Sequence, residues 1–493
     1  MDNLNYQTLE KKRYNGYLLQ EAPERVLQFG EGNFLRAFVD YFVDVANEKG
    51  DFNSKVVITQ PIGGGLADMI NDQQGLYTLY LRGSKNGEAV EEKRVISCVS
   101  RCLNPYKDYA DLLEVAHNPE LRFIISNTTE AGIVYDDSCK FDDAPPASFP
   151  AKLTRFLYER FSAFGNESGK GLVILPCELI DDNGVELEKC VRQHISDWNL
   201  SEDFCKWLDS EVLFCPTLVD RIVPGYPRNE AEKLWEQNGY SDNLIDTGEL
   251  FGLWVIEGPD SLKEELPFEK SGLPVIVTGD HKPYKERKVR ILNGAHTTMF
   301  SVGYLSGMDI VRECMDDENL YSFTRKTIFD EIIPTLSLPQ DELEQFAEDV
   351  LDRFKNPYID HQLLSISLNS VSKWRARVLP TVRGYMGKFE KVPVRLVLGF
   401  AALLEFYHGD KVLDGKLIAK RNGDDYEVLD DAWVLEFFAA HYGDSIEEYV
   451  VNVCANEKFW GMNLNDIPQF TDTVVEYVTD IRKNGMADTV KSC

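Results

Sequence analysis

The sequence predicts an α/β N-terminal domain with a parallel, doubly wound sheet, followed by a mostly α-helical C-terminal domain. Short β-branched runs alternate with helical patterns up to about residue 284, and long helical patterns dominate after it. A pair of glycines also lies at the first strand–helix junction. Because 493 residues are too many for one ordinary core, we expect two domains, at 1–284 and 285–493.

Hydrophobic periodicity gives the expected elements in order. The first strand is expected at 26–29, and an amphipathic helix at 33–48 follows it. Further strands are expected at 56–59, 123–126, 172–175, 212–214 and 275–277. Helices of the second half are expected at 288–305, 343–354, 395–407 and 431–441. The segment 280–284 is the expected connection between the domains.

The composition is that of a soluble globular protein, with 43% hydrophobic and 27% charged residues. The formal charge of 52 − 82 = −30 argues against nucleic acid or an anionic membrane as a partner. The first residues lack the basic and apolar regions of a signal peptide, and the apolar stretch 396–406 is too short to span a membrane. We therefore expect a cytoplasmic protein whose partner is a small molecule; its oligomeric state stays open.

Ten cysteines are scattered along the chain without any CxxC pair. None lies at zinc-ligand spacing from a histidine or another cysteine. We therefore expect reduced thiols in core positions and no structural metal.

The turn after the first strand has the pattern of a dinucleotide-binding site. Glycines between a strand and a helix permit a tight turn and a close approach to a pyrophosphate, as in Rossmann-type domains. Only two glycines of the usual three are present, because Leu35 stands at the third position, and a plain strand–turn–helix junction would look the same. The candidate cofactor-binding residues of this turn are Phe29, Gly30, Glu31, Gly32, Asn33 and Phe34.

Polar residues follow two further strands of the expected sheet. Gln60 comes after the second strand, which lacks the acidic residue that usually holds a ribose 2′-hydroxyl, so the residues alone do not distinguish NAD from NADP. Thr128 and Glu130 follow the third strand, where the central part of a dinucleotide would pass. Turn and helix-cap chemistry would use the same residue types.

Lys288, Asn293 and His296 form a Lys-x4-Asn-x2-His pattern in a predicted helix. A lysine can transfer the proton of a hydroxyl group, and asparagine and histidine can hold its oxygen, as hydride transfer at an alcohol carbon requires. Lys288 and His296 would be about 12 Å apart along an ideal helix, so the three converge only on an extended substrate or an irregular turn. A solvated helix face would also be polar.

Several charged residues are candidates for substrate binding. A carboxylate substrate of this acidic chain would need a local basic pocket. The candidates are Asp220, Arg221, Lys373 and Arg375, with Arg377 as a further cation. A structural ion pair at Asp220 and Arg221, or a basic surface around Lys373, would explain the same residues.

Three separated segments, 29–38, 212–224 and 288–296, together resemble the polyol-specific long-chain dehydrogenases, the mannitol dehydrogenase group. The resemblance implies a Rossmann-type domain, NAD as cofactor and zinc-independent oxidation of a carbinol. It implies that Lys288 is the general acid/base and that Asn293 and His296 orient the reacting oxygen. Lys373 matches a lysine of the family in its second domain.

The chain departs from the polyol enzymes at two positions. It has Leu179 where they show an asparagine and Ser365 where they show an arginine. Segments 28–38 and 125–133 look typical of a branch that acts on sugar acids, which implies reversible oxidoreduction of a hexonate/keto-uronate pair. A different sugar acid, a neutral polyol, an epimerase and a non-catalytic nucleotide sensor are the alternatives.

Overall fold

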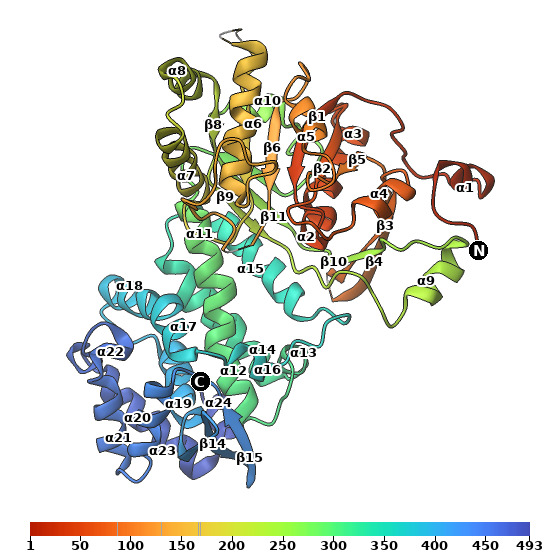
Figure 1. The fold of residues 1–493 in the computed structure, drawn as a ribbon. Coiled ribbons are helices and arrows are strands. Elements are labelled where there is room, and N and C mark those ends of the chain that lie inside the picture. Colours follow the sequence, from red (N-terminus) through yellow and green to blue (C-terminus); the bar gives the residue numbers. More distant parts are fainter. Residues whose placement is uncertain (86, 130, 166, 168) are drawn as a thin grey trace. The chain divides into compact units, whose positions relative to one another are not determined.

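The computed structural model describes residues 1–85, 87–129, 131–165, 167 and 169–493. It divides into two compact units (Figure 1). Unit 1 comprises residues 1–82 and 90–281, and unit 2 comprises residues 83–89 and 282–493. Unit 1 contains a parallel sheet with helices and unit 2 is largely helical, which confirms the predicted fold class.

The main sheet of unit 1 has six parallel strands. In spatial order these are β5 (Val99–Leu103), β2 (Lys55–Thr59), β1 (Glu24–Phe29), β6 (Phe123–Ser126), β7 (Val173–Pro176) and β8 (Leu213–Phe214). From β1 the chain adds β2 and β5 on one side of this strand. It then crosses over and adds β6, β7 and β8 on the other side. In sheets of this kind the carboxyl ends of the strands at this reversal form the ligand site.

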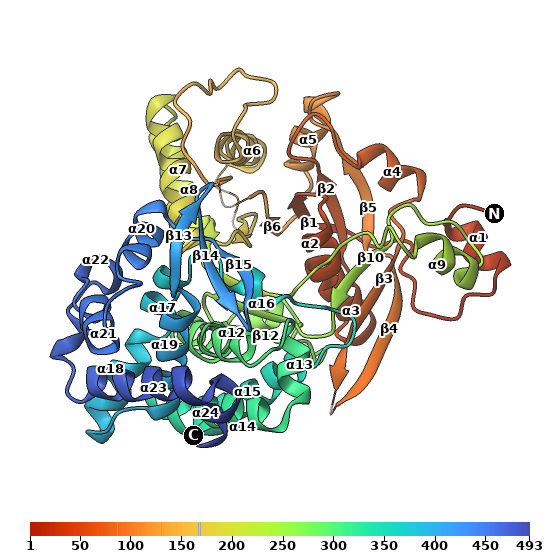
Figure 2. The ribbon, with the colours of Figure 1, turned by 90° about the horizontal axis from the view of Figure 1, so that it is seen from below.

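Both faces of this sheet are covered, which explains why its strands are continuous apolar runs. Leu27 and Ile124 pack on one face against α5 (Tyr109–Val115), α6 (Phe149–Phe164), α7 (Asn183–Asp197) and α8 (Glu202–Glu211). Figure 2 shows α6 and α7 side by side on this face. Val26 and Ile58 pack on the other face against the helix after β1.

That first helix is continuous but changes its winding. It comprises α2 (Asn33–Leu35), a π-helical turn (Arg36–Asp40) and α3 (Tyr41–Lys49). The prediction of one helix from 33 to 48 is therefore confirmed in extent, although periodicity did not show the π turn.

Two smaller sheets belong to unit 1, except for residues 83–89 at the joined ends of β3 and β4. One has the order β10 (Asp246–Glu249), β3 (Tyr77–Lys85), β4 (Glu88–Ile96), and the other β12 (Val275–Thr278), β11 (Leu253–Glu257), β9 (Thr217–Asp220). The strand expected at 275–277 thus lies outside the doubly wound sheet, because it pairs with β11. The remaining helices are α1 (Tyr6–Lys11), α4 (Ala67–Asp72), α9 (Ala231–Asn238) and α10 (Leu262–Glu265).

Unit 2 is built around α19 (Val394–Phe406), which packs against α12 (Ala295–Leu305) and α23 (Phe470–Asn484). Before α12 lie α11 (Lys282–Arg287) and a π-helix (Lys288–Gly294). The other helical segments are α13 (Val311–Asp316), α14 (Glu318–Lys326), a π turn (Thr327–Ile332), a 3₁₀ turn (Ile333–Thr335), α15 (Gln340–Phe354), α16 (Leu363–Ile366), α17 (Ser370–Arg377), α18 (Leu379–Phe389), α20 (Ala432–Ala440), α21 (Ile446–Cys454), α22 (Glu457–Trp460), a 3₁₀ turn (Leu464–Asp466) and α24 (Met486–Lys491).

A three-stranded antiparallel sheet interrupts these helices. It comprises β13 (Gly409–Leu413), β14 (Lys416–Arg421) and β15 (Asp424–Val428). Periodicity did not show it, because half of its strand residues are charged and its strands are short. Among the described residues, no helix combines the length and the apolar character needed to cross a membrane.

Candidate functional site

The glycine turn of unit 1 has two glycines with different constraints. Gly30 has a φ of 127°, and a Cβ atom there would lie 3.1 Å from the carbonyl oxygen of Asn127. Gly32 has a φ of −64°, and a Cβ atom there would meet nothing within 4 Å. Gly30 is therefore required by the fold of the turn. Gly32 leaves open space beside the first N–H groups of the helix, where a phosphate group binds favourably.

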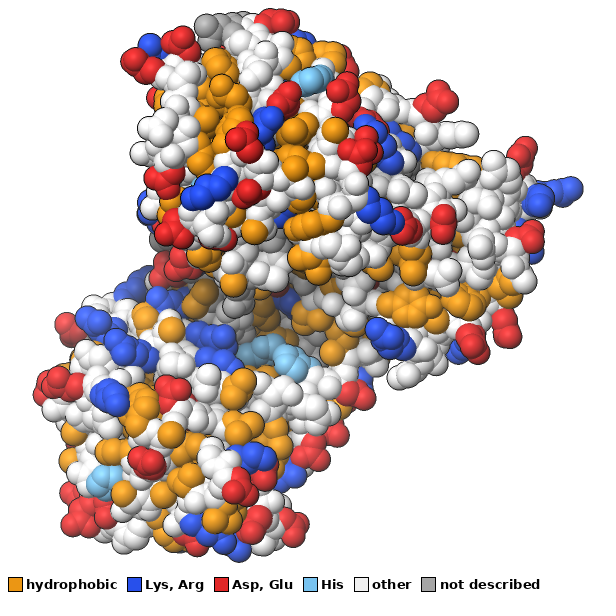
Figure 3. Space-filling view, in the orientation of Figure 1, with side chains coloured by type: hydrophobic (Ala, Val, Ile, Leu, Met, Phe, Trp, Pro, Cys, Tyr) orange, Lys and Arg blue, Asp and Glu red, His pale blue; other side chains and the backbone are white. Residues whose placement is uncertain are grey.

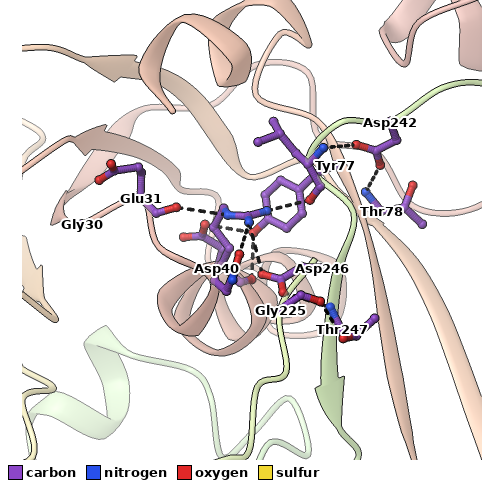
Figure 4. A network of polar contacts seen from close by, with 12 residues as sticks. Gly30, Glu31, Asp40, Tyr77, Thr78, Gly225, Asp242, Asp246 and Thr247 are labelled. Atoms are coloured by element: carbon purple, nitrogen blue, oxygen red, sulfur yellow. Dashed lines mark hydrogen bonds and ion pairs between the residues drawn. The ribbon is translucent and has the colours of Figure 1, made fainter. Parts of the chain in front are cut away.

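Arg36 holds this turn in place. Its Nε donates to the carbonyl oxygen of Glu31 at 3.1 Å, and its Nη2 donates to Asn33 Oδ1 at 2.6 Å. Its Nη1 donates to the carbonyl oxygen of Leu244 at 2.7 Å, so one guanidinium links the turn to the segment before β10. Figure 4 shows these contacts converging between Glu31 and Asp246.

Buried carboxyl groups surround Arg36. Asp246 Oδ2 lies 3.6 Å from Arg36 Nη2, and Asp40 Oδ2 accepts a hydrogen bond from the Tyr77 hydroxyl at 2.9 Å. Burial raises the pKa of both carboxyl groups to about 7, although Arg36 acts in the opposite direction. The sequence did not single out Arg36, although its spacing from Asp40, four residues later in the same helix, was visible.

The other predicted residues of the turn have local roles. The Phe29 ring packs against the Phe149 ring at 5.1 Å, and the Phe34 ring stacks on the Phe38 ring at 5.1 Å. Burial raises the pKa of the Glu31 carboxyl group.

Gln60 and Thr128 are both committed to contacts within unit 1. The Gln60 amide donates to the carbonyl oxygens of Ile62 and Gly63, and so fixes the loop after β2. The backbone N–H and hydroxyl of Thr128 each donate to Glu178 Oε1 at 3.0 Å, which joins the carboxyl ends of β6 and β7. Glu130 lies outside the described residues.

A cavity of about 800 Å³ lies at the carboxyl ends of β1, β2 and β6. Phe29, Ile62 and Thr128 line it from the strand ends, and Ser148 and Lys152 line it from the start of α6. Its position beside the strand-order reversal and the glycine turn fits a bound dinucleotide.

In unit 2, Lys288 and Asn293 both belong to one π-helix (Lys288–Gly294). In an α-helix, residues five apart are rotated about 140° from each other. A π-helix joins residues i and i+5 by its hydrogen bonds, which brings the two side chains to one face. An irregular turn is one of the two conditions under which the predicted trio could converge.

His296 lies in the first turn of α12, and its ring is held between aromatic side chains. It stacks on the Phe354 ring at 4.2 Å and meets the His361 ring edge-on at 5.2 Å. Its buried Nε2 has no hydrogen-bond partner in the described structure. Burial, followed by the charges of neighbouring groups, lowers the pKa of His296 well below its usual value, so the ring is neutral. Nε2 is therefore available to a ligand oxygen.

The cations of α17 divide between two sides of the helix. Lys373 and Arg377, four residues apart, both act electrostatically on His296. Lys373 Nζ donates to the carbonyl oxygen of Ile366 at 3.0 Å, and Arg377 Nη1 lies 3.4 Å from Thr297 Oγ1. In the described part of the chain neither forms an ion pair with a carboxylate. In Figure 3, a histidine surface lies beside lysine and arginine side chains on unit 2.

Arg375 and Arg221 lie elsewhere. Arg375 is exposed and points toward Gly461, where a Cβ atom would lie 2.7 Å from its Nη2. Arg221 is buried in unit 1, where its guanidinium donates to the carbonyl oxygens of Ala37 at 2.7 Å and Phe251 at 2.9 Å. Its contacts are those of a structural anchor, unlike the substrate-binding role that we expected. Asp220 precedes it at the end of β9 and is also buried.

The ten cysteines are unpaired, and eight of them are buried. Among the described residues, no three His, Cys, Asp or Glu side chains are grouped so that they could hold a metal ion.

Comparison with known proteins agrees with the two-part fold. The model of the mannitol dehydrogenase Rossmann domain matches residues 24–270, and that of the mannitol dehydrogenase C-terminal domain matches residues 280–482. Altronate oxidoreductase of Escherichia coli O6:K15:H31 (strain 536 / UPEC) is 47% identical over 491 residues, which cover 98% of this chain and 99% of that protein. Altronate oxidoreductase of Shigella flexneri has the same identity and coverage.

Two solved structures share the fold. D-sorbitol dehydrogenase in substrate-free form is 22% identical with a TM-score of 0.81, and the match covers 99% of this chain and 100% of that one. Pseudomonas fluorescens mannitol 2-dehydrogenase, solved as a ternary complex with NAD and D-mannitol, is 24% identical with a TM-score of 0.66 and 99% coverage of both chains. Two domain models matched in order and full-length relatives confirm the predicted resemblance: the chain belongs to the mannitol dehydrogenase family.

Proposed function

We propose that the protein is an NAD-dependent oxidoreductase that interconverts D-altronate and D-tagaturonate, a hexonate/keto-uronate pair of hexuronate catabolism. The full-length relatives at 47% identity, which are named altronate oxidoreductase, support this substrate pair. The structural observation that carries the proposal is the pair Lys373 and Arg377, whose charges face a neutral His296 without a carboxylate partner in the described structure. The ten unpaired cysteines fit a reducing compartment, the cytoplasm.

The glycine turn supports NAD as the cofactor. The open space at Gly32 and the N–H groups that follow it would receive the pyrophosphate, while Arg36 fixes the turn from behind. When bound, NAD supplies the acceptor for the hydride of the carbinol carbon.

Lys288, Asn293 and His296 would carry the proton chemistry. In the oxidation direction Lys288 Nζ, in its neutral form, accepts the proton of the hydroxyl group as hydride leaves the carbon. The Asn293 amide donates a hydrogen bond to the same oxygen. Nε2 of the neutral His296 ring forms a second hydrogen bond with this oxygen. In reduction the same lysine, protonated, returns the proton to the oxygen.

The cations of α17 would bind the substrate carboxylate. Arg377 can present two parallel N–H groups to a carboxylate, and Lys373 adds a second charge on the same helix face. The anionic substrate thus meets a local positive field on a chain whose net charge is −30.

The test compares Arg377→Gln with Arg375→Gln, which removes an equal charge from the exposed side of the same helix. A lost charge-assisted contact costs about 1.5–3 kcal/mol, so Arg377→Gln should raise KM for D-tagaturonate about ten- to a hundredfold. Reduction of D-fructose, a neutral ketose, should change by less than about threefold in either variant. Equal KM values for D-tagaturonate in both variants would contradict the assignment of the carboxylate to Arg377.

A further inference from the structure

The start of α6 brings a lysine into the cavity of unit 1. Lys152 lies in the first turns of this 16-residue helix, whose N-cap is Ser148. Both residues line the cavity, together with Phe29, Ile62 and Thr128 from the ends of three strands. The backbone N–H groups of Ala151 and Lys152 both donate to Ser148, and Pro150 has no N–H group. The Lys152 ammonium group is therefore what this helix end offers to an anion, in a cavity that Asp136 and Asp137 also line.

The side chain of Lys152 is buried in the wall of this cavity. The residue is 3% exposed, and its Nζ donates one hydrogen bond, to the carbonyl oxygen of Ala147 at 2.8 Å. It forms no ion pair with a carboxylate of the described residues. Burial lowers the pKa of Lys152 to about 8, so the ammonium group stays predominantly protonated at neutral pH. A charged lysine in such surroundings needs a partner, and two of its three N–H groups remain for one.

The contacts of Lys152 place it beside the end of β2. Its Nζ lies 5.3 Å from the centroid of the Tyr106 ring, and the Tyr106 hydroxyl donates to the carbonyl oxygen of Pro61 at 2.8 Å. In doubly wound sheets this strand end faces the adenosine part of the dinucleotide. The acid that usually binds the ribose there is missing, and the Gln60 amide is committed to its own loop.

We infer that Lys152, in the first turns of α6, is a phosphate-binding residue for the adenosine half of the dinucleotide. Its ammonium group donates to a phosphate oxygen, of either the pyrophosphate or a 2′-phosphate. This goes beyond the glycine turn, and it rests on the proposed use of a nicotinamide dinucleotide. The two sources of the oxygen differ in consequence, because a 2′-phosphate contact would let the protein use NADPH as well as NADH.

Equilibrium binding without any sugar substrate tests the inference. The dissociation constants of NADH, NADPH, ADP and 2′,5′-ADP are measured by calorimetry for the full chain and for Lys152→Gln. Lys152→Arg retains the charge, and Lys189→Gln removes an exposed lysine that is ion-paired with Glu186. Thermal unfolding of each variant shows whether it is folded. We expect Lys152→Gln to weaken phosphate binding about ten- to a hundredfold, and the other two variants to change it by less than about threefold.

The pattern of loss identifies the phosphate. If Lys152→Gln binds NADH and NADPH more weakly to the same extent, Lys152 contacts the pyrophosphate. If only NADPH and 2′,5′-ADP are bound more weakly, Lys152 contacts the 2′-phosphate. Unchanged constants in a folded Lys152→Gln variant overturn the inference, as does equal weakening in Lys189→Gln. If the unaltered protein binds neither NADH nor NADPH, the proposed function itself fails, and the two failures are thereby distinguished.

Discussion

At the scale of single residues, the proposed chemistry depends most on Lys288. Replacing it with alanine removes the only group assigned to proton transfer, and it leaves the glycine turn of unit 1 unchanged. General acid–base groups contribute about 10²–10⁴-fold, so kcat of Lys288→Ala should fall by at least about a hundredfold. The dissociation constant of NADH, from calorimetry, should stay within about twofold of the unaltered value, because Lys288 belongs to the other compact unit. Retention of more than about a tenth of kcat would remove Lys288 from the acid–base role.

Asp40 gives a prediction about stability and pH. Burial raises the pKa of its carboxyl group from 3.8 to about 7, so the folded state binds this proton more tightly than the unfolded state does. Its contribution to the free energy of unfolding is therefore greatest at low pH and is lost as pH rises from about 4 through 7.

Asp40→Asn should remove this dependence while keeping an acceptor for the Tyr77 hydroxyl. Urea unfolding at pH values between about 5 and 8 should show a smaller fall in stability for the variant than for the unaltered protein. Asp72→Asn, at an exposed position, is the control and should reproduce the original slope. An unchanged slope in Asp40→Asn would mean that this carboxyl group titrates normally in the folded protein.

Residue types and spacing were sufficient to propose Lys288, Asn293 and His296 for proton transfer, since those side chains make a pattern within nine positions. Arg221 was expected to bind substrate, and the structure shows its guanidinium on backbone carbonyl oxygens instead. The difference is physical: a sequence does not show which carbonyl groups lack a partner in the folded core. Lys152 was missed, although its place on the apolar face of a helix, four residues before Phe156, was visible in the sequence.

At the scale of elements, the two glycines of the turn are expected to have different roles. Gly30 is needed for folding, and Gly32 for the approach of the cofactor. Gly30→Ala places a Cβ atom at a φ of 127° and 3.1 Å from the carbonyl oxygen of Asn127, so it should destabilise unit 1 by about 1–3 kcal/mol. Gly32→Ala has an ordinary φ and open space, so its stability should change by less than about 1 kcal/mol.

The same two variants should differ in cofactor binding. The methyl group of Gly32→Ala would occupy the approach to the helix N-terminus, so its dissociation constant for NADH should rise at least about tenfold without loss of stability. Urea unfolding and calorimetry on the two proteins measure both effects. Unaltered NADH binding in Gly32→Ala would show that the pyrophosphate does not approach this turn.

The elements differ in how well periodicity predicted them. Buried parallel strands were found because both faces of the sheet are covered, which makes each strand a continuous apolar run. The π-helix from Lys288 to Gly294 was not found, because a helix with one wider turn keeps the same residue types as an α-helix. The sheet of β13, β14 and β15 and the strand β4 were missed because their exposed residues are mainly charged.

At the scale of the whole molecule, strand–helix alternation followed by long helices was sufficient to predict the fold class. Which strands share a sheet was not predictable from the pattern: β12 joins β11 and β9, although its sequence resembles a strand of the main sheet. The proposed separation of cofactor binding in unit 1 from proton transfer in unit 2 follows from where the two motifs lie in the chain. The specific sugar acid, in contrast, is proposed to depend on a few side chains around His296.

The most direct test of this account measures NADH oxidation by the purified protein with D-tagaturonate, D-fructuronate and D-fructose. All three offer a ketone, and only the first two carry the carboxylate that Lys373 and Arg377 are proposed to bind. The account predicts the highest kcat/KM for D-tagaturonate, and a value for D-fructose at least about tenfold lower, because a neutral hydroxymethyl group leaves the cations unpaired. Reduction of D-fructose as efficiently as D-tagaturonate would contradict the carboxylate site and would identify the protein as a polyol dehydrogenase.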